Sequence, residues 1–164
     1  LKFAKCENSA CQGRTITTVD SANSVGFDNS IAIGTDGLPV ISYTGTTAGV
    51  LKVAKCIDAA CAAATITTVD DPANRVGQHT SIAIGTDGLP VISYFDFTAG
   101  ALKVARCANA ACTAATTATV DDPANRVGEP TAIAIGADGL PVISYFDSTA
   151  GALKVAKCGT RSCQ

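Results

Sequence analysis

The sequence predicts an all-β protein assembled from copies of one four-stranded unit. The chain repeats itself, with segments of 50 and then 51 residues beginning at Leu1, Leu51 and Leu102 and a shorter segment beginning at Leu153. The second and third segments are identical at 40 of 51 positions. Short apolar or β-branched runs separated by turn residues, at a period near 50, are typical of stacked β architectures. We therefore expect one repeat array over residues 1–164, with repeats 1–50, 51–101 and 102–152 and a partial repeat 153–164.

The first half of the middle repeat contains two expected strands and a connector. Residues 51–56 and 65–69 are short runs rich in apolar and β-branched side chains, which favour strands. Residues 57–60 form the tight loop between them. Residues 70–77 read Asp-Asp-Pro-Ala-Asn-Arg-Val-Gly. Because Pro72 has no N–H to donate to a sheet, this segment is expected to be a connector.

The second half supplies two more strands. Residues 81–84 place both isoleucines on one face and small residues on the other, as in a strand. Residues 85–90 contain an Asp-Gly pair, which is a strong hairpin signal. Residues 91–94 form the fourth strand, and 95–100 return the chain to the next Leu-Lys-Val-Ala.

Four strands joined by short loops, with one longer connector, predict antiparallel four-stranded blades of a β-propeller. The strand at 81–84 is expected to be innermost, because its small alternate side chains suit a crowded axis. The chain then holds three blade equivalents and is incomplete at both ends. A β-solenoid-like repeat array is the alternative, although solenoid coils are shorter and lack a repeated hairpin pair.

A resemblance supports this interpretation. Residues 81–96, S-I-A-I-G-T-D-G-L-P-V-I-S-Y-F-D, together with the Leu-Lys-Val-Ala and Thr-Val-Asp runs, resemble tandem repeats of similar length in secreted bacterial and archaeal proteins that form predicted β-propellers. The D-G-x-P-x-I-S-Y core is the most specific part, and the likeness covers essentially the whole chain. This chain has Val91 where those repeats often have histidine, and a cysteine hairpin where they often have tryptophan. The resemblance implies an extracellular blade module without a uniform activity.

The eight cysteines form one C-x4-C pair in each repeat. This spacing suits a short hairpin loop whose flanking positions face each other at disulfide distance. We therefore expect four local disulfides, with a zinc site or free thiols as alternatives; the pairs lie a full repeat apart, which disfavours zinc. Disulfides indicate an oxidising compartment and hence an extracellular or cell-surface location. The pairs are Cys6/Cys11, Cys56/Cys61, Cys107/Cys112 and Cys158/Cys163.

Composition excludes several classes of partner. The net charge of −2 and pI near 5.2 leave no basic stripe for phosphates, so no nucleic-acid partner is expected. No run approaches the eighteen apolar residues of a membrane-spanning helix, so no membrane span is expected. The apolar content of 47% is ample for a buried core. The chain starts without methionine inside one repeat and stops inside another, which is typical of a processed or truncated piece.

Signatures of catalysis are absent from the sequence, and we expect no enzyme, no catalytic residue and no metal ligand set. His79 is the only histidine, and neither a nucleophile elbow nor a phosphate-binding glycine loop occurs. No cofactor is expected, apart from Ca²⁺ as an alternative at Asp70/Asp71 and Asp121/Asp122, where connector capping explains the carboxylates equally well. The Asp of each Asp-Gly turn is expected to stabilise that turn.

A candidate ligand site lies in the grooves between blades, where two repeats share an aromatic, acidic and basic set. Low aromatic content and the absence of tryptophan weigh against sugar stacking there. The set comprises Tyr94, Phe95, Asp96 and Arg75, and again Tyr145, Phe146, Asp147 and Arg126.

The pair of basic residues on each Leu-Lys-Val-Ala strand is a further recurring feature, lysine at both places in two repeats and Lys103 with Arg106 in the other. Lys52 and Lys55 are three residues apart, so their side chains point to opposite faces of a strand. We expect one to be solvated and the other to contact an acidic residue such as Asp70 or Asp96 between blades.

These observations favour an extracellular structural or adhesive module that is non-catalytic and self-associates through its incomplete terminal blades. Two chains sharing blades would give a six-bladed ring, and a joint that does not close would give a filament. A carbohydrate-binding, lectin-like propeller with a glycan partner is the first alternative. A fragment of a secreted hydrolase propeller is the second.

Overall fold

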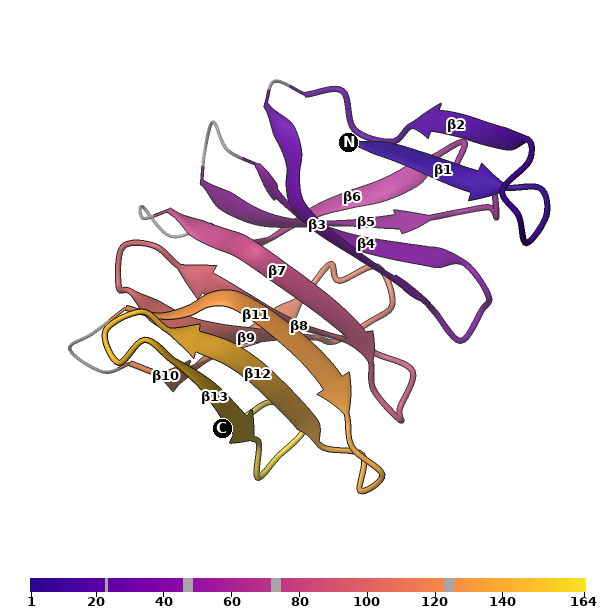
Figure 1. Ribbon diagram of the computed structural model, residues 1–164. Helices are drawn as coiled ribbons and strands as arrows, with labels where there is room; N and C mark the ends of the chain where they lie inside the picture. The colour runs from indigo at the N-terminus through magenta and orange to yellow at the C-terminus, as the bar shows by residue number, and fades with distance from the viewer. Residues whose placement is uncertain (23, 46–48, 72–74, 123–125) are drawn as a thin grey trace.

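The computed structural model describes residues 1–22, 24–45, 49–71, 75–122 and 126–164, which form strands and turns (Figure 1). This part of the chain contains no helix long and apolar enough to span a membrane. The strands are β1 Lys2–Cys6, β2 Arg14–Thr18, β3 Val25–Ile33, β4 Pro39–Gly45, β5 Val50–Cys56, β6 Ala64–Asp70, β7 Val76–Ile84, β8 Pro90–Asp96, β9 Ala101–Cys107, β10 Ala115–Asp121, β11 Val127–Ile135, β12 Pro141–Asp147 and β13 Ala152–Lys157.

The strands form four sheets, each a meander in chain order. We call them the amino-terminal hairpin (β1–β2), the first sheet (β3–β6), the second sheet (β7–β10) and the third sheet (β11–β13). Every pairing between the described strands is antiparallel. The predicted all-β, four-stranded antiparallel unit is therefore confirmed, and a parallel β-solenoid is excluded for these residues.

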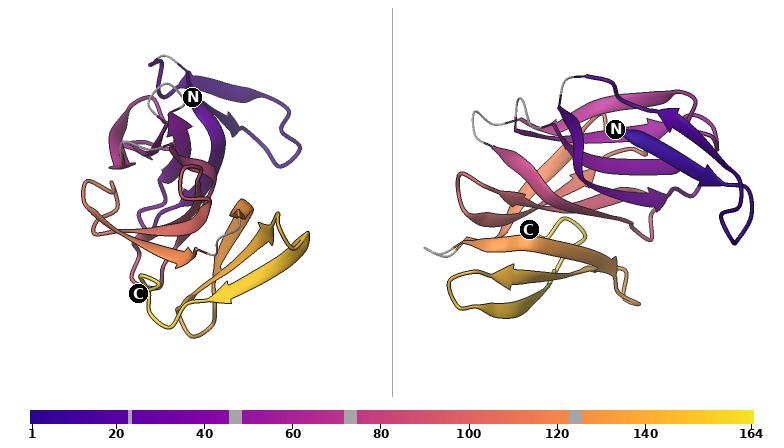
Figure 2. Two further views of the ribbon diagram at one scale, coloured as in Figure 1. Left: turned by 90° about the vertical axis from the view of Figure 1, so that its left-hand side faces the viewer. Right: turned by 45° about the horizontal axis from the view of Figure 1, so that its top comes forward.

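The sheets pack face to face in chain order, with the hairpin and the third sheet at opposite ends of the stack (Figures 1 and 2). Strand β7 contacts both β3 and β11, so the first strands of successive sheets lie side by side. These are the strands with the small alternate face, as expected for the innermost position. The outer positions are taken by the β-branched strands β6 and β10.

The innermost strands begin earlier than the sequence pattern predicts. Strand β7 starts at Val76, inside the expected connector, because Val76 pairs with Asp96 across two register shifts. A backbone with positive φ at Gly77 (83°) and His79 (51°) accommodates these shifts. The strand β6 likewise extends to Asp70. The predicted connector is therefore shorter than expected, and its Pro72 lies outside the described residues.

The apolar core lies between the sheets, in three layers that we call seams. The first seam joins the hairpin to the first sheet, the second joins the first sheet to the second, and the third joins the second sheet to the third. In the second seam, Val40, Leu51 and Val53 of the first sheet pack against Val76 and Ile82 of the second. Equivalent residues form the third seam. Each sheet is consequently stabilised by its neighbours.

At each seam, a glycine near the start of the new sheet packs against a leucine of the preceding sheet. A Cβ at Gly77 would lie 2.7 Å from the Cα of Leu51, which is fully buried on the preceding sheet. Gly26 lies in the same way over Leu1, and Gly128 over Leu102. The Val-Gly pair of each repeat thus allows the backbone of one sheet to approach that of the next.

Serine and threonine hydroxyl groups form hydrogen bonds between neighbouring sheets near the innermost strands. The Ile82 N–H donates to Ser30 Oγ at 3.2 Å, and Thr80 donates to Ser42 Oγ at 2.9 Å. The next seam repeats both bonds, from Ile133 to Ser81 and from Thr131 to Ser93.

We predict that Gly77→Ala destabilises the fold more than Gly37→Ala, as measured by urea unfolding. Both glycines have positive φ, which costs a non-glycine residue about 1–2 kcal/mol. A Cβ at Gly37 meets no described atom within 4 Å, whereas one at Gly77 collides with the Leu51 backbone and adds about 1–3 kcal/mol of overpacking. Equal losses in the two variants would show that the seam is not closely packed there.

Candidate functional site

Each seam contains a tyrosine, a lysine and an aspartate that meet at one carboxylate oxygen. In the first seam the Tyr43 hydroxyl donates to Asp20 Oδ2 at 2.7 Å, and Lys52 Nζ lies 3.0 Å from the same oxygen. The tyrosine and lysine belong to one sheet, and the aspartate lies at the end of the last strand of the preceding unit or, for Asp20, just beyond it. We call this group the seam triad. Its other copies are Tyr94, Lys103 and Asp70, and Tyr145, Lys154 and Asp121.

The electrostatics of the seam triads fix their protonation states. Burial raises the pKa of Tyr94, and the hydrogen bond to the negative Asp70 raises it further. The same causes raise the pKa of Tyr145 to about 12. Burial opposes ionisation of Asp20, but hydrogen bonds from Tyr43, the Ala22 N–H and Lys52 outweigh it and lower the pKa of Asp20 to about 2. In the first seam the Tyr43 hydroxyl therefore donates to an ionised Asp20 carboxylate.

The tyrosines and acidic residues of the predicted ligand site serve this internal framework. Tyr94 is fully buried and Tyr145 nearly so. The Asp96 carboxylate accepts the N–H groups of Thr98 and Ala99 at 3.0 and 2.9 Å and so caps the β8–β9 turn. Asp147 caps the β12–β13 turn in the same way.

The aromatic and basic residues of the predicted site separate into a buried and an exposed group. Phe95 is fully buried, while Arg75 and Arg126 lie on the surface. The Arg126 guanidinium carbon lies 5.0 Å from the ring centre of Phe95 and 4.6 Å from that of Phe97, and the Arg75 carbon lies 4.8 Å from Phe97. Phe146 remains partly exposed because none of the described sheets covers it. Sequence reasoning missed Phe97, since the third repeat has serine there.

A row of charged side chains crosses the start of the three innermost strands. His79 Nδ1 lies 3.9 Å from Asp28, and His79 Nε2 lies 3.3 Å from Glu129, which pairs with Arg126 at 2.7 Å. Asp28, His79 and Glu129 come from β3, β7 and β11, so the row links all three sheets. The described residues include no group of three or more His, Cys, Asp or Glu arranged to hold a metal ion.

The four C-x4-C pairs are closed as disulfides, with Cα–Cα distances of 4.7–4.9 Å. The pairing is as predicted, but the expectation that the two cysteines face each other across the hairpin is wrong. Cys56 faces Ala64 instead, and Cys107 faces Ala115, so the second cysteine lies inside the loop. The correction applies to the second cysteine of every pair, each with a positive φ: Cys11 (55°), Cys61 (51°), Cys112 (55°) and Cys163 (57°).

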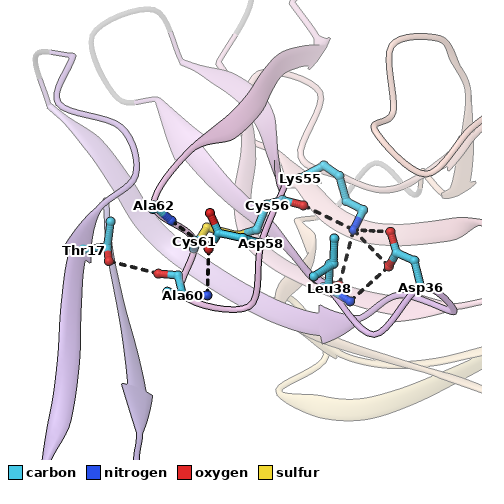
Figure 3. Close-up of a disulfide and its surroundings, with 9 residues drawn as sticks. All are labelled: Thr17, Asp36, Leu38, Lys55, Cys56, Asp58, Ala60, Cys61 and Ala62. Atoms are coloured by element: carbon cyan, nitrogen blue, oxygen red, sulfur yellow. Dashed lines mark hydrogen bonds and ion pairs between the residues drawn. A yellow bond between two sulfur atoms is a disulfide. The ribbon is translucent and has the colours of Figure 1, made fainter.

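The loop backbone explains this position of the second cysteine. The Cys112 N–H donates to the Asn109 carbonyl at 3.0 Å, and the Cys163 N–H donates to the Thr160 carbonyl at 3.2 Å. The chain thus makes a turn of its own before the next strand can begin, and the disulfide folds the loop back on its first strand. In the Cys56–Cys61 loop, Asp58 Oδ1 braces this turn by accepting the N–H of Ala60 at 2.8 Å (Figure 3).

The second cysteines contribute to the apolar seams as a result. Cys61 is buried in the first seam and Cys112 in the second. Cys163 is partly buried against the third seam, beside Cys158. Three of the four disulfides therefore fill the outer end of a core layer as well as closing a loop, whereas Cys6 and Cys11 are exposed.

The disulfide loops also tie neighbouring sheets together at the outer rim. The Thr17 hydroxyl on β2 donates to the Ala60 carbonyl at 2.9 Å, so the Cys56–Cys61 loop holds the amino-terminal hairpin (Figure 3). Thr67 makes the same bond to Ala111 of the next loop at 3.1 Å. The third seam differs, because an ion pair between Arg161 and Asp87 at 3.7 Å joins the loop to the second sheet.

Lys55, the second lysine of the pair on β5, is not solvated as expected. Lys55 is buried, and its Nζ lies 2.8 Å from Asp36 Oδ2 in the β3–β4 turn of the same sheet. The hydrogen bond from Lys55, together with the Leu38 N–H, lowers the pKa of Asp36. The expectation is wrong for Lys55 because the Asp-Gly turn brings a carboxylate beside it. The first lysine does contact an aspartate of the neighbouring sheet, as Lys103 contacts Asp70.

The last face of the third sheet is open. Leu153 is 76% exposed and Val155 is 64% exposed, although their counterparts on the first and second sheets are fully buried in seams. Above this face lies a cavity of about 370 Å³ lined by Thr131, Ser144 and Phe146 as well as Leu153.

A second open area lies on the first sheet beside the hairpin. Ile31 is 52% exposed, whereas its counterpart Ile82 is 7% exposed in the second seam. A cavity of about 190 Å³ separates Ile31 from Leu1 and Phe3 of the hairpin. The two open areas lie toward opposite ends of the stack (Figure 1). Both interrupt the otherwise regular pattern of seams.

Comparison with known proteins finds similarity in fold only. No protein-family model and no curated protein sequence matches the chain. A Dyadobacter fermentans protein of unknown function has a similar structure, with a TM-score of 0.63 and 10% identity over 81% of this chain and 37% of that one. A GH43 β-1,3-galactosidase has a TM-score of 0.55 and 12% identity over 90% of this chain and 38% of that one.

A fucose lectin from Kordia zhangzhouensis, solved with methyl-fucoside, has a TM-score of 0.50 and 8% identity over 81% of this chain and 94% of the lectin. The GH43 galactosidase and the lectin are propeller-type folds, so the sheets described here are of the propeller type. The chain spans less than two fifths of the first two neighbours. The resemblance to secreted tandem repeats stays a prediction.

We predict that the first seam weakens in acid through Asp20. The folded pKa of about 2 lies below the ordinary value of 3.8, so the folded state binds fewer protons than the unfolded chain between these values. The stability due to Asp20 is therefore present above pH 4 and is lost as the pH falls from about 4 to about 2. Urea unfolding at several pH values should show a shallower acid decline in Asp20→Asn than in wild type. The exposed Asp122→Asn serves as control, and parallel curves for all three proteins would contradict this role.

Proposed function

We propose that the chain is an extracellular, non-catalytic structural module that builds a larger propeller by associating with further copies of itself. The observation that carries this proposal is the contrast between equivalent residues. Side chains that are buried in the seams are exposed at the two open faces. Contiguous exposed apolar surface of this kind is typical of protein–protein interfaces.

The two open faces complement each other. In the second seam Ile82 packs in one cluster with Val40 of the preceding sheet. The hairpin opposite Ile31 has no strand equivalent to the one that carries Val40. Val142 occupies that position on the third sheet, where it is only half-buried. The third sheet of one copy therefore offers the strand that the first sheet of another copy lacks.

The disulfides support the extracellular part of the proposal, because such bonds persist in oxidising compartments. They close loops that also hold neighbouring sheets, which suits a module for adhesion or for a durable coat. The non-catalytic part rests on the sequence and on His79, the only histidine, which lies between two carboxylates rather than beside a nucleophile.

Carbohydrate binding is a second candidate function. Arg75, Phe97, Arg126 and the His79–Glu129 pair gather where the innermost strands begin. The fucose lectin, matched over 94% of its length, supports a glycan-binding role for a chain of this extent. Binding on a glycan array that is lost in Arg126→Ala would favour this candidate over a purely structural module. Activity in a longer parent protein would favour the hydrolase alternative.

We predict that the chain associates in solution and that Ile31→Glu prevents it. Light scattering at micromolar concentration should give a multiple of the 16.4 kDa chain mass for wild type and 16.4 kDa for the variant. A charge at this half-exposed position leaves the monomer folded but cannot be buried in an interface. Ile57→Glu, on a somewhat more exposed isoleucine in a disulfide loop, should still associate. A monomeric wild-type chain, or equal masses for both variants, would contradict the proposal.

A further inference from the structure

We infer that copies of the chain join by strand exchange, in which β1 of one copy replaces β13 in the third sheet of a second copy. This inference rests on the proposed self-association and names its joint. The segments that contain the two strands, 1–6 and 153–158, read Leu-Lys-Phe-Ala-Lys-Cys and Leu-Lys-Val-Ala-Lys-Cys. They differ only at Phe3 and Val155. Strand β12 therefore has two nearly identical candidate neighbours, one on its own chain and one on another.

The register of the exchanged pair follows from the pairs already present. Strand β12 places Tyr145 opposite Lys154 and Val142 opposite Lys157, and β4 pairs with β5 in the same register. After exchange, Tyr145 would face Lys2 of the second copy, and Val142 would face its Lys5. The sheet would then run β11, β12, β1, β2, which is the complete four-stranded order of the first and second sheets.

Unpaired charges on β1 match the carboxylates beside β12. On β5, β9 and β13 both basic residues form ion pairs with aspartates. Lys2 and Lys5 are exposed and make no ion pair within the described residues. Their counterparts on β13 are Lys154, which contacts Asp121 and Asp147, and Lys157, which contacts Asp138. Exchange would give Lys2 and Lys5 these same aspartates.

Exchange also removes the exposed apolar face of the third sheet. Leu153 and Val155 point to an open face and leave with β13. Leu1 and Phe3 take their positions, and Phe3 already packs against Ile41 and Tyr43 of its own first sheet. The first sheet of the incoming copy then packs next to the shared sheet, and Val142 of one copy lies opposite Ile31 of the other.

The covalent structure favours release of β13 over release of β1. Strand β1 is joined to β2 by the short loop that contains the Cys6–Cys11 disulfide, and the two strands pair along the whole of β1. Among the described strands, β13 pairs with β12 only, and the Cys158–Cys163 disulfide does not link it to another strand. Releasing β13 therefore breaks one strand pair, which β1 restores, and leaves the stapled hairpin intact.

Two such joints close a ring of two copies. Each copy contributes two complete four-stranded sheets, and each joint makes one shared four-stranded sheet, which gives six sheets in total. Closed propellers have four to eight blades, so a ring of six falls within the known range. Both joints are equivalent by twofold symmetry.

The test is native mass spectrometry and light scattering of four variants at equal concentration. Lys2→Glu would place a carboxylate against Asp121 and Asp147 of the other copy, and the dissociation constant should rise at least a hundredfold. Lys2→Arg should retain association. Arg14→Glu makes the same change of charge on the same hairpin. Arg14 is exposed on β2, which does not pair with β12 in the exchanged sheet, so this variant should associate like wild type. Deletion of residues 153–164 frees β12 and should leave association intact or strengthen it.

The outcomes separate this joint from the proposed function. A wild-type dimer that persists in Lys2→Glu, or that dissociates when residues 153–164 are deleted although the variant stays folded by circular dichroism, would overturn the exchange and leave self-association standing. Should the deletion variant fail to fold, the comparison of Lys2→Glu with Arg14→Glu decides alone. A wild-type chain that is monomeric at every concentration would overturn both.

Discussion

The rest of the structure depends on a buried aspartate that ends one sheet and is held by the tyrosine and lysine of the next. A carboxylate in such a position is costly unless it is paired and hydrogen-bonded, and the seam triad supplies both. The groups that satisfy it come from a different sheet. A sheet therefore leaves its own charged group without partners unless a neighbour follows. The apolar side chains obey the same rule, because the core lies between sheets rather than within them.

This dependence explains why the seams are so regular. The glycine that approaches Leu51, the hydroxyl ties of Thr80 and Ser42 and the Asp20 triad all recur at the matching places of the next repeat. Because the sequence repeats, the interface between sheets repeats as well. We therefore expect the open faces to form the same contacts as the internal seams. Lys2, Lys5 and the exposed Ile31 then lack contacts that their counterparts make in the other repeats.

Sequence reasoning predicted what depends on local pattern. Alternation in residues 81–84, the Asp-Gly turns and the C-x4-C spacing were enough for the strand order and for the disulfide pairs. The spacing did not reveal that the second cysteine lies inside its loop, because that depends on a turn of the backbone. The start of β7 was placed too late, because the bulge around His79 depends on pairing with Asp96 across the sheet. The hydrogen bond from Tyr94 to Asp70 was not foreseen, because the two residues lie 24 positions apart in the sequence. Phe97 and the His79–Glu129 pair escaped notice because neither is repeated.

Electron microscopy of the purified 164-residue chain tests the central claim most directly, because it counts the sheets around the axis. The account predicts closed particles with six sheets and twofold symmetry, in which four sheets come wholly from one chain and two are shared. Isolated wedges of three sheets with Ile31 and Leu153 open to solvent, at concentrations where an interface of this kind forms, would contradict it.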